Sequence, residues 1–398
     1  MAEERKAASE VISGTRIADV EPDAGLAHIR HLLHQHPELG FHETWTTTTL
    51  SRLLADRGLE PRTLPSGTGL VADIAGTRPG PLVALRSDID GLPVAEETGL
   101  EFASQNRGRM HACGHDLHMT GLLGAAFWLA SHRDAIAGTV RILFQPAEET
   151  GRGARSVIDD GVLEGVQAIA GIHNNPDYAP GEIAVGLEPM MAGCVKLRVD
   201  LHAQGTHAGY PQSGTGPLEA LASIILSLQT IVSRNVTPFH PVVLSVTEVH
   251  GGSVWNVVPA EAGLLGTVRY FHKQDSELVE RRFRRIVDST AAAYGITADV
   301  VWDDFQDPVV SDPSLGAAVA ADVPGYAQLA PIRPSMAGED FCEYSKVTRT
   351  VFAFVGSNGG PDHHDLHSPR MVVLDEAIAP AVRFYVAAAL RLLEELAS

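Results

Sequence analysis

Short apolar runs alternate with segments of helical periodicity through much of the chain. Leu26, Ile29, Leu32 and Leu33 have helical spacing, and a second such pattern covers 46–57. Strands are predicted at 69–74, 82–85, 140–144, 168–172 and 351–355, and a helix at 118–132. Strands that alternate with helices predict an α/β fold with a mostly parallel sheet covered on both faces. Residues 1–15 are expected to be frayed, and helical at best.

Polar side chains follow four of these predicted strands. In open α/β sheets ligands bind beyond the carboxyl ends of the strands, so these side chains are expected to share one edge. They are Asp88 and Asp90 after 82–85, Glu148 and Glu149 after 140–144, His173 after 168–172, and His363, His364 and His367 in the loop after 351–355.

The middle of the chain has a different order of predicted elements. Its predicted order is strand, helix, strand, strand, helix, strand, at 195–201, 217–234, 242–249, 263–271, 276–294 and 296–302. This βαββαβ order is that of a ferredoxin-like unit. We therefore expect an inserted lid and dimerisation domain over 193–304, between two parts of a catalytic domain at 16–192 and 305–398.

Composition excludes several classes of protein. The chain has 398 residues, with 30 Lys and Arg against 49 Asp and Glu, a formal net charge of −19. Nucleic-acid binding needs cationic patches and is not expected. The N-terminus lacks the apolar core of a signal peptide, and we find no apolar run long enough for a membrane span. Three cysteines make no disulfide framework, so a reduced cytoplasm is the expected compartment.

Cys113, Gly114 and His115 form a candidate metal-binding segment. The glycine would let the backbone bend so that thiolate and imidazole reach one ion. These ligands suit zinc, with cobalt, nickel and manganese as alternatives. The alternative is a buried apolar cysteine beside surface histidines, and supporting roles are expected for His111 and His118.

Glu148 and Glu149 are candidates for a base and a metal ligand. Neighbours in extended chain point to opposite sides, so one carboxylate could bind metal while the other takes a proton from water. Asp90 fits a role in orienting a metal-bound imidazole. The alternatives are a solvated acidic pair and a turn-forming aspartate.

The inserted segment offers three polar candidates for substrate binding. Arg269 presents a planar fork that matches a carboxylate, while His207 and Asn256 could donate to a developing oxyanion. The alternative is that these residues only face water.

Taken together, the motifs resemble the M20 metallopeptidase and amidohydrolase family, in its branch of bacterial aminoacylases, hippurate hydrolases and plant auxin-conjugate hydrolases. The resemblance spans about residues 28–376. The matching stretches are 30–34, 37–41 with Glu43, Arg86-Ser-Asp-Ile-Asp-Gly-Leu-Pro93, Met110-His-Ala-Cys-Gly-His-Asp116, Phe144-Gln-Pro-Ala-Glu-Glu149, 171–173, 256–259, 266–269, Gly338-Glu-Asp-Phe341 and Leu366-His-Ser-Pro369.

The resemblance implies hydrolysis of the amide bond of an N-acyl amino acid at a site with two divalent metal ions. It implies Glu148 as general base, and a homodimer, or a tetramer built from dimers, in which His207 comes from the partner's lid. Asn256 and Arg269 would contact the substrate. The implied metal ligands are Cys113, His115, Glu149, His173 and His367.

The chain departs from the family pattern at a few positions. Gly91 stands where alanine is usual, and the lid loop is Gly205-Thr-His-Ala-Gly209 where Gly-Gly-His-Ala-Ala is commoner. His363 and His364 precede the expected ligand His367, which is favoured because Leu366-His-Ser-Pro369 is the matching part. The alternatives to an N-acyl amino acid hydrolase are a dipeptidase or carboxypeptidase with the same chemistry, and a non-catalytic binding protein.

Overall fold

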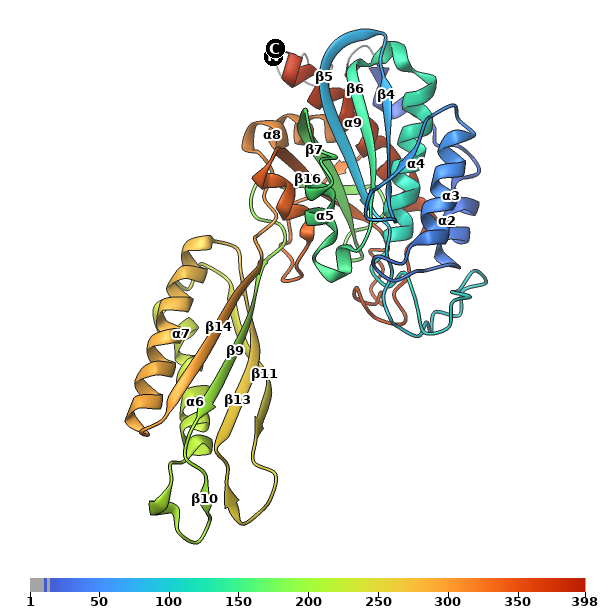
Figure 1. Cartoon of the computed structure of the whole chain (residues 1–398). Coiled ribbons are helices and arrows are strands. Elements are labelled where there is room, and N and C mark those ends of the chain that lie inside the picture. Colours follow the sequence, from blue (N-terminus) through green and yellow to red (C-terminus); the bar gives the residue numbers. More distant parts are fainter. Residues whose placement is uncertain (1–10, 13–14, 398) are drawn as a thin grey trace. The chain divides into compact units, whose positions relative to one another are not determined.

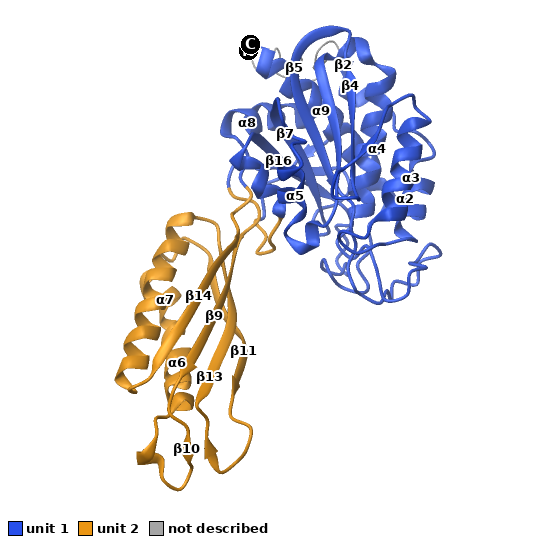
Figure 2. Cartoon of the chain, viewed as in Figure 1, with its two compact units in different colours: residues 1–188, 310–333, 340–398 blue, residues 189–309, 334–339 orange. Residues whose placement is uncertain are grey.

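The computed structural model describes residues 11–12 and 15–397, and the chain divides into two compact units. Unit 1 comprises Met1–Glu188, Val310–Arg333 and Asp340–Ser398, and unit 2 comprises Pro189–Val309 and Pro334–Glu339 (Figure 2). The insertion expected over 193–304 falls within the longer segment of unit 2, whereas the segment Pro334–Glu339 was not anticipated. Each unit has its own hydrophobic core.

An eight-stranded mixed sheet forms the middle of unit 1 (Figure 1). Its strands are β3 (Arg62–Thr63), β4 (Leu70–Ala75), β5 (Arg78–Asp88), β6 (Ala137–Gln145), β7 (Val166–Asn175), β8 (Glu182–Val185), β15 (Gln328–Leu329) and β16 (Arg349–Gly356). The order is β15-β8-β16-β7-β5-β6-β4-β3, and the four strands β16, β7, β5 and β6 are parallel. Every residue of β5 from Val83 to Asp88 is buried, which requires cover on both faces.

Six helices of unit 1 surround this sheet. They are α2 (Leu26–His34), α3 (Thr44–Ala55), α4 (His115–Ser131), α5 (Gly153–Asp159), α8 (Pro313–Asp322) and α9 (Ile378–Ala397). Helices α4 and α9 pack against each other and against β5, and Figure 1 shows α9 behind the central strands. Glycine makes their close approach possible, because a Cβ on Gly121 would lie 2.8 Å from the Cβ of Ala381.

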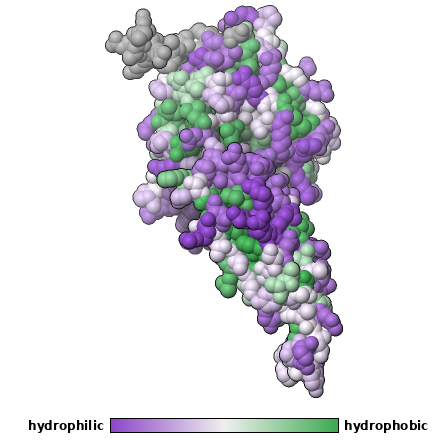
Figure 3. All heavy atoms as spheres, turned by 90° about the vertical axis from the view of Figure 1, so that its left-hand side faces the viewer, coloured by the Kyte–Doolittle hydropathy of each residue, from purple (hydrophilic) through white to green (hydrophobic). Residues whose placement is uncertain are grey.

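Unit 2 is a four-stranded antiparallel sheet with two helices. Its elements are β9 (Gly193–His202), α6 (Pro217–Asn235), β11 (Val242–Gly251), β13 (Glu261–Tyr270), α7 (Lys273–Ala293) and β14 (Thr297–Gln306). The order β11-β13-β9-β14 is that of a ferredoxin-like βαββαβ unit, as the sequence predicts. A separate pair of short strands, β10 (Thr206–His207) and β12 (Val257–Val258), carries His207. Hydrophilic and hydrophobic residues are interleaved on the surface of this unit (Figure 3).

The N-terminal region differs from its expectation where the structure describes it. Strands β1 (Val11–Ile12) and β2 (Thr15–Arg16) form an antiparallel pair instead of a helix. The rest of the expectation for 1–15 falls on residues 1–10 and 13–14, which lie outside the described residues.

Helix α9 was not predicted, although it completes the core of unit 1.

Of the helices in 15–397, none is both long enough and apolar enough to span a lipid bilayer.

Candidate active site

The bend before α4 brings Cys113 and His115 within reach of one ion. Gly114 has a φ of +79°, in the left-handed region that favours glycine. A Cβ at Gly114 would lie 2.5 Å from Oδ1 of Asn174 on β7. The ligand atoms of Cys113, His115 and His173 lie within 4.8 Å of one another. The bend expected from the sequence is therefore present, and both conformation and space require glycine there.

Hydrogen bonds orient the rings of His115 and His173. Nδ1 of His115 lies 2.8 Å from the carbonyl oxygen of Asp90, and Nδ1 of His173 lies 2.7 Å from that of Asn174. Because a carbonyl oxygen only accepts, each Nδ1 donates a proton, and each Nε2 is directed away from that bond. Nε2 of His173 lies 3.3 Å from Sγ of Cys113. Metal-binding histidines are commonly held through their other ring nitrogen in this way.

Glu148 and Glu149 lie in a 3₁₀ turn, η3 (Glu148–Thr150), and the expected extended conformation is wrong. Strand β6 ends at Gln145, and Ala147 has a φ of +56°, so the chain turns before the two glutamates. The turn brings both carboxylates toward His115, with ligand atoms of the three residues within 4.8 Å. The two carboxylates therefore face one site, where they can still perform separate functions.

His367 joins the same set of side chains. Its Nε2 lies 3.5 Å from Oε1 of Glu149, and these two residues form a group with Cys113. His363 is engaged elsewhere, because its Nε2 lies 3.0 Å from a carboxylate oxygen of Asp177. The overlapping groups contain all the predicted ligands and the predicted base: Cys113, His115, Glu148, Glu149, His173 and His367.

Asp90 contacts the predicted ligand His115 mainly through its backbone. The carbonyl oxygen makes the 2.8 Å contact, whereas the carboxylate Oδ1 lies 3.5 Å from Nδ1 of His115. The carboxylate instead accepts the N–H groups of Glu148 at 3.1 Å and Glu149 at 3.0 Å. Asp90 thus supports both the imidazole and the turn that carries the glutamates.

Asp88 and His118 form a buried pair beside the ligand groups. Nδ1 of His118 lies 2.7 Å from Oδ1 of Asp88, and its Nε2 accepts the N–H of Asn174 at 2.8 Å. These two residues also form a group with His115 that could hold an ion. Because both ring nitrogens of His118 already have partners, a supporting function fits His118 better. His111 is buried as well, and neither of its ring nitrogens has a hydrogen-bond partner among the described residues.

The electrostatics of the site fit a cation. Burial alone would lower the pKa of His115, but the negative charges of Asp88, Asp90 and Glu149 outweigh it and raise the pKa to about 10. Burial, followed by the charge of Glu149, raises the pKa of the Cys113 thiol well above its ordinary value. A divalent cation would offset this negative charge and favour thiolate and neutral imidazole as ligands. Thiolate, imidazole and carboxylate together suit zinc.

An unpredicted buried network adjoins the proposed base. Arg86, fully buried in β5, donates to Asp88 at 2.8 Å and to Asp340 at 3.0 Å. Gln145 also donates to Asp340, at 2.8 Å, and the N–H of Asp340 donates to Oε1 of Glu148 at 3.3 Å. The sequence did carry a signal for this network, which is an arginine inside an apolar strand. Such an arginine indicates buried partners, because buried arginines are rare unless they are paired.

Unit 2 holds the three predicted substrate-binding residues in two places. The N–H of Ala208 donates to the carbonyl of Asn256 at 3.0 Å, so His207 and Asn256 lie near each other around β10 and β12. Figure 1 shows β10 beyond one end of β13. Arg269 lies near the opposite end of β13, where it pairs with Cys194. The length of β13 that separates them is about 26 Å at a rise of ~3.3 Å per residue.

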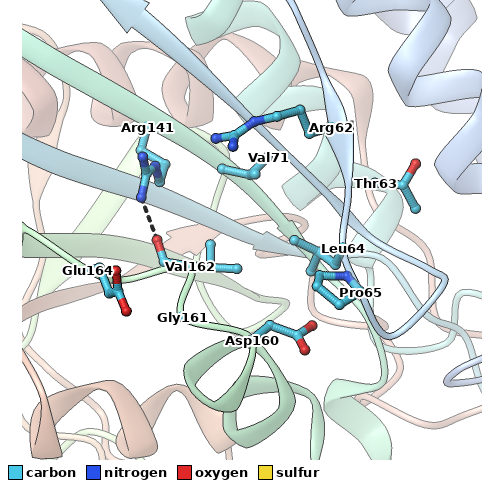
Figure 4. A pocket seen from close by; sticks show the side chains of 10 residues that line it. All are labelled: Arg62, Thr63, Leu64, Pro65, Val71, Arg141, Asp160, Gly161, Val162 and Glu164. Atoms are coloured by element: carbon cyan, nitrogen blue, oxygen red, sulfur yellow. Dashed lines mark hydrogen bonds between the residues drawn. The ribbon is translucent and has the colours of Figure 1, made fainter.

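A cavity at the edge of the sheet in unit 1 is lined by none of the predicted site residues. It has a volume of about 430 Å³ and lies beside β3, β4 and β6 (Figure 4). Arg141 there donates to the carbonyl of Val162 and is paired with Asp73, so its charge is already neutralised. The cavity is therefore separate from the candidate metal site.

Comparison with known proteins identifies the family. The model of Peptidase family M20/M25/M40 matches residues 84–391, which is more than half of the chain. The chain belongs to this family, as its sequence motifs predict.

Individual relatives cover nearly the whole chain. An N-acetyl-L-cysteine deacetylase of Bacillus subtilis is 42% identical over 371 residues, covering 93% of this chain and 88% of the relative. Thermostable carboxypeptidase 1 of Saccharolobus solfataricus is 34% identical and covers 83% of this chain and 86% of its own. The crystal structure of the Bacillus subtilis YXEP protein, described as a dinuclear metal binding peptidase, is similar with a TM-score of 0.83 at 36% identity, covering 93% of this chain and 98% of that one.

Proposed function

We propose that the protein is a metal-dependent amidohydrolase that cleaves the amide bond of N-acyl amino acids. The observation that carries the proposal is the convergence of one thiol, three imidazoles and two glutamates in unit 1. The deacetylase relative supports an N-acyl amino acid as the substrate. In this proposal Cys113, His115, Glu149, His173 and His367 bind two divalent ions.

Zinc is the proposed metal, with manganese, cobalt and nickel as alternatives, because the donor set combines a soft thiolate with imidazoles and a hard carboxylate. A cytoplasmic location is proposed because all three cysteines are free and buried. No nucleic acid or membrane is proposed as a partner.

The two ions, when bound, would supply Lewis-acid activation of a water molecule and of the amide carbonyl. Glu148 then accepts a proton from the attacking water and delivers it to the leaving amine. The N–H of Asp340 orients the Glu148 carboxylate through their 3.3 Å hydrogen bond. The carboxylate of Asp90 positions the turn by accepting hydrogen bonds from the N–H groups of Glu148 and Glu149.

The substrate is proposed to bind residues of two subunits. Arg269 would pair with the free carboxylate, while His207 and Asn256 would donate to the oxyanion. Because Arg269 and His207 lie at opposite ends of the same unit 2, one small substrate cannot contact both from one chain. We therefore propose a homodimer, or a tetramer of dimers. In it, His207 and Asn256 of the partner subunit contact the substrate.

A carboxypeptidase or dipeptidase is the second candidate, because one relative is named a carboxypeptidase. A panel of N-acyl amino acids and dipeptides, assayed for amine release with the metal fully loaded, separates the two. The proposal predicts that kcat/KM is at least about tenfold higher for the N-acyl amino acids, the discrimination expected from ~1.4 kcal/mol of differential transition-state binding. Faster cleavage of dipeptides would establish the second candidate instead.

A further inference from the structure

Three consecutive backbone N–H groups beside the candidate metal site are held by two buried carboxylates. Glu43 Oε1 accepts the N–H of Ala147 at 2.8 Å. The carboxylate of Asp90 accepts the next two N–H groups, of Glu148 and Glu149. The first N–H groups of a helical turn have no partner within the turn, so these two acidic side chains satisfy all three of them.

The turn held in this way is strained. Ala147 has a φ of +56°, a conformation that residues with a Cβ rarely adopt. Such a conformation persists only where the surroundings fix it. The segment before Glu43 packs closely on the turn as well, because a Cβ on Gly40 would lie 3.0 Å from both Cα and Cβ of Ala147. The Ala147 peptide is thus fixed from two sides.

Glu43 is anchored so that it can hold this peptide. Its carbonyl accepts the hydroxyl of Thr47 at 2.6 Å, and that hydroxyl accepts the N–H of Gly69 at 2.9 Å. The Glu43 residue is fully buried. Burial, followed by the negative charge of Asp90, raises the pKa of Glu43 to about 7. A buried carboxyl next to another carboxylate does not favour folding, which points to a requirement in the site.

We propose that Glu43 is a positioning residue, which fixes the Ala147 turn and thereby the carboxylates of Glu148 and Glu149. The proposal rests on the functions proposed above for these two glutamates. Glu43 acts through its hydrogen bond to the N–H of Ala147. Its effect on the two glutamates therefore depends on a side chain long enough to make this bond. A displacement of about 1 Å in a reacting group is enough to lower the rate by ~100-fold.

The test compares three substitutions at Glu43. Glu43→Gln keeps an acceptor oxygen at the same reach, Glu43→Asp keeps the charge but shortens the side chain, and Glu43→Ala removes the acceptor. Glu38→Ala is the matched control, because Glu38 accepts N–H groups of Trp45 and Thr46 at the start of α3 and has no bond to the turn.

Zinc affinity, measured by competition with a chelator, is the first readout and needs no substrate. The proposal predicts zinc binding weakened about 10- to 100-fold in Glu43→Asp and Glu43→Ala, as for other residues that orient ligands. Glu43→Gln and Glu38→Ala should stay within about threefold of the wild type, well below that range. Equal affinity in Glu43→Asp and Glu43→Gln would overturn the proposal, even if Glu43→Ala failed to fold.

The second readout is kcat and KM for an N-acyl amino acid at saturating zinc. We expect kcat to fall about 100-fold in Glu43→Asp with KM within about twofold, because the base is displaced while substrate contacts remain. Unchanged kcat in this variant would also overturn the proposal. If the wild type showed no turnover but its variants still lost zinc affinity in the predicted order, the proposed function would be wrong. Glu43 would then remain a positioning residue for Glu149.

Discussion

Glu148 is the side chain on which the proposed chemistry depends most. Replacing it by glutamine keeps the size and the contact with the N–H of Asp340 but removes the basic oxygen. We expect Glu148→Gln to lower kcat by roughly 100- to 10,000-fold, the usual contribution of general base catalysis, while bound metal is retained. Kinetics and metal analysis of the purified variant measure both quantities.

Glu164→Gln is the control for this substitution, because Glu164 lines the separate cavity of Figure 4. It should leave kcat unchanged. Normal turnover by Glu148→Gln would show that another residue is the base.

Gly114 offers a test of the bend that carries Cys113 and His115. Alanine there would have a left-handed φ, at about 1–2 kcal/mol, and its Cβ would also overlap Asn174. Gly58→Ala is the matched control, because Gly58 has a φ of +73° and open space around its Cβ position. We expect both variants to lose unfolding free energy and only Gly114→Ala to lose bound metal. Full metal content in Gly114→Ala would contradict the proposed ligand functions of Cys113 and His115.

The sequence predicted which residue types meet at the site better than it predicted how they are held. Cys113, Gly114 and His115 were recognisable because all three are local to one bend. The conformation of Glu148 and Glu149 was predicted wrongly, because it depends on the left-handed Ala147. That conformation is held by Glu43, 104 positions away, and local periodicity carries no information about such a contact.

Helix α2 is joined to α4 by a buried ion cluster. Asp116 on α4 accepts a hydrogen bond from Arg30 at 2.9 Å, and Nδ1 of His34 lies 3.2 Å from the same carboxylate. Burial alone would lower the pKa of His34, but Asp116 and Glu96 outweigh it and raise the pKa to about 9. Protonated His34 therefore stabilises the fold below its unfolded pKa of 6.5.

This stabilisation should be lost as the pH rises through 9. We expect the difference in unfolding free energy between the wild type and His34→Gln to shrink by up to about 3 kcal/mol between pH 6 and pH 10. Urea unfolding of chelator-treated protein at both pH values measures it. A constant difference for His34→Gln would mean that folding does not raise the pKa of His34.

Most strands and helices were predictable because their apolar periodicity is clear. Helix α9 was missed, although its apolar and polar residues have a helical periodicity as clear as that of α2. Its partner α4 was predicted only from residue 118, because the polar start of α4 belongs to the metal-binding segment.

The proposed site needs residues of two subunits. We expect a mixture of Glu148→Gln and His207→Ala subunits, dissociated and reassembled together, to regain about a quarter of the wild-type activity, since half of the sites in half of the dimers would be complete in a C2 dimer. Each variant alone should be nearly inactive. No activity in the mixture would show that each site is complete within one chain.

The order of elements in unit 2 was predictable, since its strands and helices alternate clearly along 193–304. The segment Pro334–Glu339 was not, because it joins unit 2 from a distant part of the chain. The separation of His207 from Arg269 along β13 likewise follows from strand pairing and was not visible in the motifs.

The dependence of amide hydrolysis on bound metal can be measured in a single assay. Amine release from N-acyl amino acids is followed before chelation, after chelation and after re-addition of zinc, manganese, cobalt or nickel. We expect turnover to vanish with chelator and to return when up to two ions per chain are bound. Undiminished turnover by metal-free protein, or no turnover of any N-acyl amino acid or dipeptide with the metal site fully loaded, would rule out metal-dependent hydrolysis of these amides.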